Sequence, residues 1–306
     1  MFPIIPANSA AAPSGNDEGI FGYGETASSV VSMTNLVSNA GVVASDTAGV
    51  GTARANLSAC EYGGDKGIFG YGGAVSGYVS VTNLVSNAGV VASDQAATTG
   101  TARTGSAACS YGEDKGIFGY GYVSGGPASA ITNLVSNAGV VASDQAATTG
   151  TVRYGLAATQ YGEDKGIFGY GSGPVSVTNL VSNAGVVASD TAGVGTARFN
   201  PSACGYGGDK GIFGYGYTDT YVSMTNLVSN AGVVASDQAA TTGTARGWSA
   251  ATQYGADKGI FGYGHIGYGE GSQQNMTNLV SNAGVVASDT AGVGTARNAL
   301  AACSFN

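Results

Sequence analysis

Short hydrophobic runs separated by turn-forming residues make up most of the chain, and the same runs return about every 50 residues. One period holds an alanine-containing run such as ACEY (position a), GIFGYG (position b), SVTNLVS (position c) and GVVAS (position d). Each run is rich in β-branched, aromatic or small residues and is bounded by Gly, Asn, Asp or Ser, as is typical of strands joined by tight turns. No run has a helical period. The pattern predicts an all-β protein with four strands in each repeat.

The hexapeptide GIFGYG occurs unchanged six times, at residues 19–24, 67–72, 116–121, 166–171, 211–216 and 259–264. Four strands per repeat and six copies predict a six-bladed β-propeller of four-stranded antiparallel blades. A ring of blades also leaves no exposed terminal sheet edge. We expect one propeller domain over residues 16–306, preceded by an N-terminal arm at residues 1–15 that could dock to a partner.

The two ends of the chain predict how this ring closes. The last repeat stops after its a run, in RNALAACSFN, whereas the first complete run is b at residues 19–24. We therefore expect Leu300–Phe305 to pair with residues 19–24 and to close the ring. Within GIFGYG, the glycines should let neighbouring sheets approach, while Phe69 and Tyr71 should share the other side of the strand and fill the space between blades.

Composition narrows the classes of partner. The chain is 43% hydrophobic and 10% charged, and no apolar run approaches the ~20 residues that span a bilayer, so we expect a soluble protein without membrane insertion. A formal net charge of −8 disfavours nucleic acid, whose phosphates require clustered Lys and Arg. The N-terminal MFPIIPANSAAAPSG lacks the basic start and apolar core of a conventional signal peptide.

Four cysteines occupy the same place in their repeats: Cys60, Cys109, Cys204 and Cys303. Thr159 and Thr252 stand there in the other two repeats, so the position accepts a small, weakly polar group and needs no bridge. Buried free thiols are the favoured interpretation, and disulfides or metal ligands are the alternative.

The run TARANLSACEYGGDKGIFGYGG at residues 52–73 resembles the kelch repeat, with an arginine, a small apolar strand, a turn and an apolar-aromatic strand ending in glycines. The resemblance extends over all six repeats and implies a propeller fold. It is incomplete, because the glycine doublet survives only at Gly72-Gly73 and the family's tryptophan before the last strand is absent. The near-identity of the repeats is similar to that of predicted proteins from uncultured bacteriophages, which implies a virion or extracellular surface location.

Variation among the repeats is concentrated in the passages between b and c, in the linkers between d and a, and in the three residues after each arginine. In an antiparallel blade these connections share one end, the variable face, while the a–b and c–d turns share the other, the constant face. Aromatic residues among Gly, Ser and Asn are typical of recognition surfaces, and aromatic rings stack on sugars. The candidate ligand-binding residues are Trp248, Tyr154, Phe199, Tyr78, Tyr122, Tyr217, Tyr221, His265, Tyr268, Asn56 and Asn298. The alternative is a face that is merely tolerant of change.

Catalytic and metal sites are not indicated. His265 is the only histidine, so neither the two-histidine copper site of some propeller oxidases nor a Ser-His-Asp triad is expected. An arginine cluster of the sialidase kind and the aspartate-box turn are also missing. We therefore expect no enzyme activity, no metal and no cofactor.

Charged residues that recur in every repeat favour a structural role, in which hydrogen bonds and ion pairs fix the d–a crossovers, over a ligand site. They are Asp46, Asp94, Asp144, Asp190, Asp237 and Asp289, with Arg54, Arg103, Arg153, Arg198, Arg246 and Arg297. The Asp-Lys pairs between a and b, such as Asp65-Lys66, are expected to be solvated turns.

The sequence thus predicts a non-enzymatic binding or recognition protein, a virion or surface component whose variable face meets a host surface carbohydrate or a host protein. Neighbouring virion or assembly subunits are further possible partners. Two alternatives remain open: a purely structural assembly or decoration protein without a free ligand, and an engineered repeat protein.

Overall fold

The computed structural model describes residues 17–96, 100–146, 150–239, 243–267, 269 and 271–305. All regular elements among these residues are β-strands, which confirms the all-β prediction. Six antiparallel sheets each contain an a, a b and a c strand, with b in the centre. The predicted N-terminal arm at residues 1–15 lies outside the described residues.

The a strands are β21 (Ala301–Phe305), β3 (Ser58–Tyr62), β9 (Ala107–Tyr111), β12 (Ala157–Tyr161), β15 (Ser202–Tyr206) and β18 (Ala250–Tyr254), for sheets 1 to 6 in that order. The b strands are β1 (Glu18–Gly22), β4 (Lys66–Gly70), β10 (Lys115–Val123), β13 (Lys165–Gly169), β16 (Lys210–Gly214) and β19 (Lys258–His265). The c strands are β2 (Thr34–Val37), β7 (Thr82–Val85), β11 (Ala128–Val135), β14 (Thr178–Val181), β17 (Thr225–Val228) and β20 (Gln273–Val280). Three short strands, β5 (Gly73–Ala74), β6 (Gly77–Tyr78) and β8 (Arg103–Thr104), lie in the variable segments.

The prediction of four strands per repeat is wrong at position d, which forms only isolated bridges such as Val37 to Val43. Residues 44–46 run past strand c, where the Asn35 side-chain amide donates to Ala44 O at 3.0 Å and to an Asp46 carboxylate oxygen at 2.9 Å. Side-chain hydrogen bonds thereby replace part of the regular ladder. The repeating unit is a three-stranded sheet with a bridged fourth segment.

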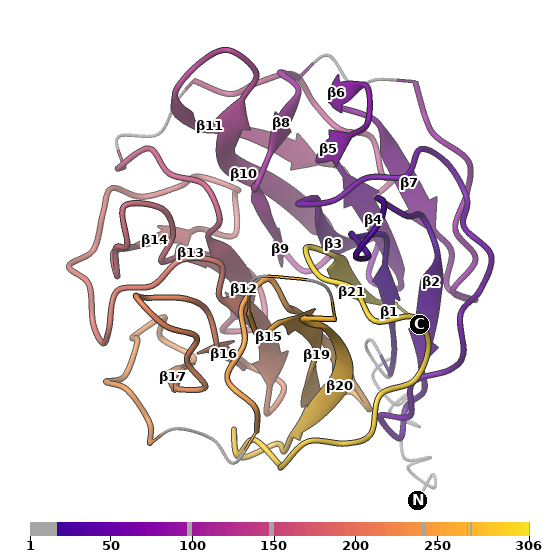
Figure 1. Ribbon diagram of the computed structural model, residues 1–306. Helices are drawn as coiled ribbons and strands as arrows, with labels where there is room; N and C mark the ends of the chain where they lie inside the picture. Colours follow the sequence, from indigo (N-terminus) through magenta and orange to yellow (C-terminus); the bar gives the residue numbers. More distant parts are fainter. Residues whose placement is uncertain are drawn as a thin grey trace, which may run out of the picture.

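The C-terminal strand pairs with the first b strand, as the sequence predicted. β21 and β1 are antiparallel, with Ala301 opposite Gly22 and Phe305 opposite Glu18. Each a strand contacts the a strands of two other sheets, in the order β3, β9, β12, β15, β18, β21 and again β3. Figure 1 shows the six sheets arranged about a common centre, with the a strands innermost.

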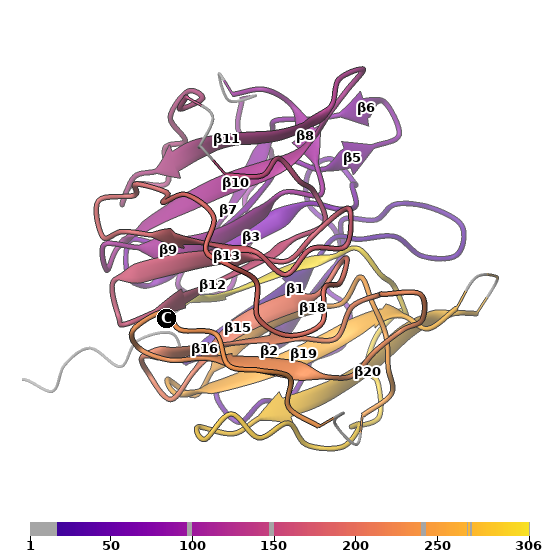
Figure 2. The same cartoon turned by 90° about the vertical axis from the view of Figure 1, so that its left-hand side faces the viewer.

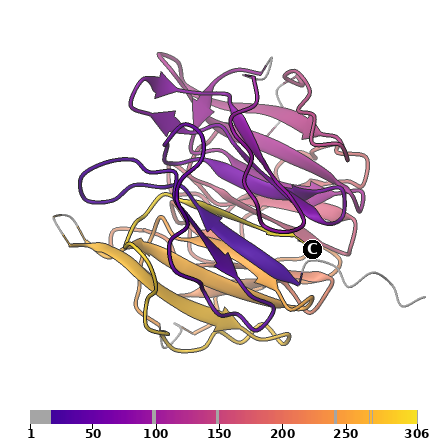
Figure 3. The same cartoon turned by 90° about the vertical axis from the view of Figure 1, so that its right-hand side faces the viewer.

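The two ends of the sheets differ in the side views. The β5–β6 hairpin projects from one side, whereas β21 ends at the opposite side (Figures 2 and 3). Isolated bridges join the two kinds of variable segment, as between Ala55 and Gly73. On the other side the c–d and a–b turns meet, with Asn87 donating to Asp65 at 3.2 Å. The variable and constant faces therefore lie where the sequence predicted them.

The hydrophobic core lies between adjacent sheets, and the predicted orientation of Phe69 and Tyr71 is wrong. Phe69 packs on Tyr23 of sheet 1, with ring centroids 5.1 Å apart, whereas Tyr71 packs on Phe118 of sheet 3 at 5.2 Å. Tyr71 has a φ of 62°, so the strand alternation ends before it and its ring turns to the other side. GIFGYG thus contacts both neighbouring sheets.

Close approach of the sheets does depend on glycine, as expected. A Cβ added at Gly70 would lie 2.7 Å from Cζ of Phe118, which is closer than real Cβ contacts allow. The same ring-on-glycine contact recurs between Gly22 and Phe69 and between Gly119 and Phe168. An aromatic ring of one sheet therefore fills the space that glycine leaves in the preceding sheet.

Candidate functional site

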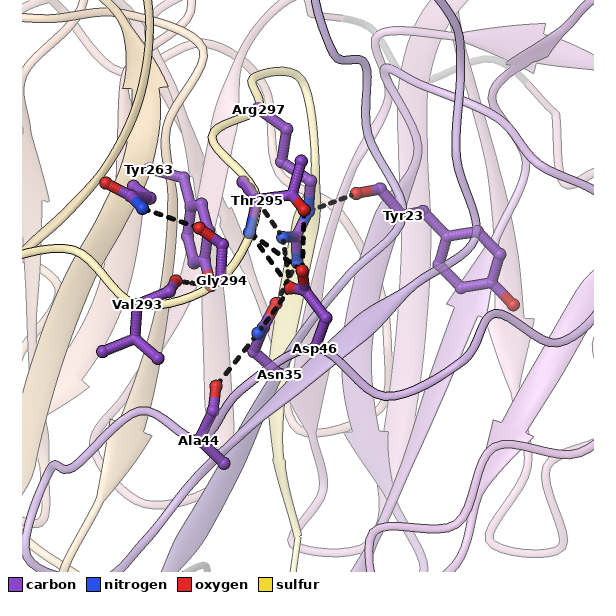
Figure 4. Close-up of polar contacts among 10 residues, drawn as sticks. Tyr23, Asn35, Ala44, Asp46, Tyr263, Val293, Gly294, Thr295 and Arg297 are labelled. Carbon is purple, nitrogen blue, oxygen red and sulfur yellow. Dashed lines mark hydrogen bonds and ion pairs between the residues drawn. The ribbon is translucent and has the colours of Figure 1, made fainter.

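A completely buried arginine lies over a tyrosine ring beneath the variable face in every repeat, and Figure 4 shows the network around Arg297. This guanidinium donates to Tyr23 O at 2.8 Å, to Asn35 Oδ1 at 2.7 Å and to Thr295 O at 3.2 Å. It also lies over the Tyr263 ring, 4.3 Å from the centroid. Because Tyr263 belongs to sheet 6 and Tyr23 to sheet 1, one side chain holds two sheets together.

The aspartates at the ends of the d segments complete these networks. Asp46 accepts from the backbone N and the hydroxyl of Thr295 at 3.0 and 2.7 Å, and lies 3.8 Å from Arg297. Burial alone would raise the pKa of Asp46, but the hydrogen bonds from Thr295 and Asn35 and the Arg297 charge lower it below its usual value. This supports the predicted structural role.

Each aspartate fixes two crossovers rather than one. Asp94 begins one d–a linker and binds Thr52, at the end of the preceding linker, through the Thr52 hydroxyl at 2.6 Å. Equivalent contacts recur for Asp144, Asp190, Asp237 and Asp289, with Thr101, Thr151, Thr196 and Thr244. The six arginines are completely buried, so the arginines support the variable face from below and present no positive charge on it.

Above these arginines, the variable segment that follows each arginine pairs with the variable segment that follows GIFGYG. The residue after each arginine bonds to the residue after GIFGYG, as Phe199 and Tyr217 do through two backbone hydrogen bonds of 2.8 Å. Comparable pairs are Ala55 with Gly73, Thr104 with Tyr122, Tyr154 with Ser172, Gly247 with His265, and Asn298 with Glu25. The variable side chains therefore stand on a paired backbone.

The second residue after each arginine has a left-handed backbone, with φ between 47° and 61°. These residues also share a hydrogen-bond circuit in which each backbone N donates to the equivalent carbonyl of another repeat, at 2.7 to 3.3 Å. The donors are Asn56, Gly105, Gly155, Asn200, Trp248 and Ala299, which donate to Ala299, Asn56, Gly105, Gly155, Asn200 and Trp248 respectively. Asn and Gly tolerate this conformation, whereas Trp248 occupies it at an energetic cost.

Eight of the predicted site residues form one continuous row of rings. Centroid distances are 6.4 Å for Tyr78–Tyr122, 5.3 Å for Tyr122–Tyr154, 5.3 Å for Tyr154–Phe199 and 5.7 Å for Phe199–Trp248. The row ends in a cluster in which Trp248 lies 6.1 Å from His265, 6.3 Å from Tyr217 and 6.4 Å from Tyr221. All eight rings are half-buried, and they come from sheets 2 to 6.

Hydrogen bonds set the protonation state of His265. Its Nδ1 lies 2.8 Å from the Tyr221 hydroxyl, and its Nε2 lies 2.7 Å from Ser272 Oγ. Ser272 donates its own hydrogen to Gly269 O, so Nε2 carries the proton and Nδ1 accepts from Tyr221. Burial lowers the pKa of His265, more than the Glu25 carboxylate raises it. The neutral imidazole is a structural part of the ring cluster.

The remaining predicted residues stand apart from the row of rings. Asn56 belongs to the backbone circuit, and Asn298 pairs with Glu25 in sheet 1. Tyr268 lies outside the described residues. Sequence reasoning missed Ser272, which orients the histidine, and also Ser172, Pro174 and Thr218, which line a hollow beside Tyr154 and Phe199. Their position within the variable passages was the only available signal.

The cysteines are free and buried, as predicted. They pack between sheets, as Cys60 does against Gly116 of sheet 3, and the a strands line a central cavity of about 50 Å³. Burial raises the pKa of Cys109 and Cys204 to about 12, so these thiols stay protonated at neutral pH. A cluster of three or more His, Cys, Asp or Glu that could hold a metal ion does not occur in the part of the chain that the structure describes.

Among the residues that the structure describes, no helix has the length and apolar character needed to span a membrane. The chain matches no protein-family model and no curated protein sequence. The resemblance to kelch repeats accordingly stays a prediction, and the site has to be interpreted from its own geometry.

Proposed function

We propose that the chain is a six-bladed, kelch-like β-propeller that recognises a ligand on its variable face and does not catalyse a reaction. The successive contacts among the six a strands and the pairing of β21 with β1 support this fold. The hydrogen-bond circuit through Asn56 and its equivalents, which returns to its starting residue, is a second and independent support. The proposed setting is a virion or an extracellular surface.

The observation that carries the binding function is the row of eight half-buried rings from Tyr78 to His265. A folding role alone does not require it, because sheet 1 has the same backbone pairing, between Glu25 and Asn298, without an aromatic residue at either position. Rigid rings with neighbouring Ser, Thr and Asn offer contact area at low entropic cost. The favoured ligand class is a carbohydrate of a host surface, and a host protein is the alternative partner.

The test compares the wild-type protein with a variant whose six b–c passages are all replaced by SGPVSV, the passage native to sheet 4. Both are applied to a broad glycan panel and to whole cells. We expect binding by the wild type and its loss in the replaced variant. A second variant, Lys115→Ala on the constant face, should bind as the wild type does. Equal binding by the wild type and the replaced variant would refute recognition by the b–c passages.

A structural assembly or decoration role is the second candidate, and one observation on the constant face favours it. The first valine of every d segment is 64 to 67% exposed: Val42, Val90, Val140, Val186, Val233 and Val285. Six apolar side chains at equivalent places suit attachment to a neighbouring subunit. If neither glycans nor cells bind the wild type, while valine-to-serine changes abolish its incorporation into an assembly, this role replaces recognition.

A further inference from the structure

One hollow on the variable face, between sheets 4 and 5, has the form of a ligand subsite. It has a volume of about 190 Å³ and is lined by the rings of Tyr154, Phe199 and Tyr217, the segment Ser172–Pro174, and Thr218. The lining is mainly apolar and includes the aliphatic hydroxyl groups of Ser172 and Thr218. Small-molecule sites commonly combine apolar walls with a few polar groups that set orientation.

The hollow exists because the b–c passage of sheet 4, SGPVSV, is the shortest of the six. Gly173 at its tip has a φ of 78° and no other atom within 4 Å of a Cβ built on it, so no neighbouring segment covers this place. The longer passage of sheet 5 supplies Tyr217 and Thr218 as the opposite wall. A difference in loop length between adjacent repeats thus leaves an opening that faces solvent.

Both walls are fixed before any ligand binds. Ser172 N donates to Tyr154 O at 2.8 Å, while Tyr154 N donates to Ser172 Oγ at 3.1 Å. Phe199 and Tyr217 exchange two backbone hydrogen bonds of 2.8 Å. Since Ser172 Oγ accepts in its bond to Tyr154, its own hydrogen can be donated to a ligand. Preorganised walls reduce the entropic cost of binding.

The distribution of cations restricts the charge of the ligand. The chain has 11 Lys and Arg residues in total. The six arginines are completely buried in the networks below the face. The five lysines all lie in a–b turns on the constant face: Lys66, Lys115, Lys165, Lys210 and Lys258. No lysine or arginine is therefore available on the variable face to pair with a carboxylate, sulfate or phosphate.

We propose that this hollow binds one uncharged pyranose residue and discriminates against sugars that carry an acidic group. The apolar C–H face of the sugar packs on Tyr154, Phe199 and Tyr217, while Ser172 and Thr218 contact ring hydroxyls. This inference rests on the proposed recognition function and names the ligand class for one part of the same face. Pro174, whose ring fixes its φ, stiffens the short passage that forms one wall of the hollow.

The experiment measures affinity for neutral glycans and for the same glycans capped with sialic acid or sulfate. Tyr217→Ala removes one wall and should weaken binding of the neutral glycans about tenfold, a hot-spot effect. Lys165→Ala, on the constant face of sheet 4, is the control and should change affinity less than about twofold. Thr218→Arg places a cation beside the hollow and should shift preference toward the acidic glycans. Equal melting temperatures show that all three variants are folded.

Each other outcome has a definite meaning. Preference of the wild type for acidic glycans, or unchanged binding in Tyr217→Ala, would overturn the proposal of a neutral-sugar site. The proposed recognition function would still stand if binding depended on the b–c passages. Cell binding that depends on the loops without any glycan binding would also overturn it and would favour a protein partner. Absence of all binding by the wild type would overturn both proposals.

Discussion

The constant and variable faces are built on the same strands but use side chains differently. On the constant face, a–b turns of adjacent sheets are joined by bonds such as Gly63 N to Asp114 O at 2.7 Å, and the turn residues are nearly the same in every repeat. On the variable face, backbone bonds also recur in every repeat, through the circuit of Asn56 and its equivalents, yet the side chains differ. On the variable face, backbone hydrogen bonds therefore fix the geometry, and the side chains do not.

This difference shows how one face can change without loss of the fold. The buried arginines, the ring-on-glycine contacts and the backbone circuit hold the sheets together below or within the backbone of the variable face. Side chains above that level contribute little to the core, so they are free to serve recognition. Substitutions in the buried scaffold should therefore lower stability, whereas substitutions of the variable side chains should lower binding and leave stability nearly unchanged.

The largest expected effect follows from removing a buried arginine. Arg153 donates to Tyr170 O at 2.8 Å and to Asn179 Oδ1 at 2.6 Å, and is fully buried. Arg153→Ala leaves these acceptors without a donor, and should lower the free energy of unfolding by about 3–5 kcal/mol. Chemical denaturation measures the change. The control Lys165→Ala removes an exposed cation in the same repeat and should leave stability unchanged; equal losses in the two variants would contradict the scaffold role of the arginines.

Glycine substitutions allow a direct comparison of the packing between sheets with the variable face. Gly70→Ala places a Cβ 2.7 Å from the Phe118 ring and should cost about 1–3 kcal/mol through overpacking. Gly73→Ala, three residues later on the variable face, meets its nearest neighbour at 3.7 Å and should change stability by less than about 0.5 kcal/mol. Thermal unfolding of both variants provides the test. Similar melting temperatures would show that the sheets can shift to accept the added methyl group.

Trp248 takes part in both the scaffold and the variable surface. Its backbone belongs to the hydrogen-bond circuit, and its ring belongs to the row of rings. Its φ of 52° suits Asn, which stands at the equivalent positions 56 and 200. Trp248→Asn should therefore be more stable than Trp248→Ala by roughly 0.5–1 kcal/mol, since only Asn tolerates the left-handed backbone well. Both should lose ligand binding equally. Denaturation and binding assays on the same samples would separate the two effects, and retained binding in either variant would remove Trp248 from the site.

The smallest expected effect is a pH dependence at the ring cluster. The pKa of His265 is lowered in the folded state, so its neutral form contributes stability that is present above the unfolded pKa of about 6.5 and is lost as pH falls through the folded pKa. The aspartates of the networks titrate lower, because their pKa values are also reduced. The melting temperature of the wild type should decrease slightly from pH 7.5 to 5, and His265→Gln should lack this component. Parallel profiles for the two proteins would contradict a lowered pKa of His265 in the folded state.

Much of the fold was accessible from local patterns. The six copies of GIFGYG located the b strands, and the incomplete last repeat predicted the pairing of β21 with β1. Two expectations failed for tertiary reasons. Position d lost its regular ladder to the Asn35 side chain, and Tyr71 turned to the opposite side of its sheet with a left-handed φ. Neither a side-chain bond across segments nor a backbone reversal inside an apparent strand alters the hydrophobic pattern.

The candidate site also depended partly on sequence and partly on tertiary structure. The sequence by itself determined which segments vary, which residues are aromatic, and that charges recur in every repeat, because these are properties of the order of residues along the chain. Only the tertiary structure decided that Tyr154, Phe199 and Tyr217 line one hollow and that the arginines are buried beneath it. These facts depend on contacts between sheets whose residues are far apart in sequence, and such distances are set by packing rather than by local propensity.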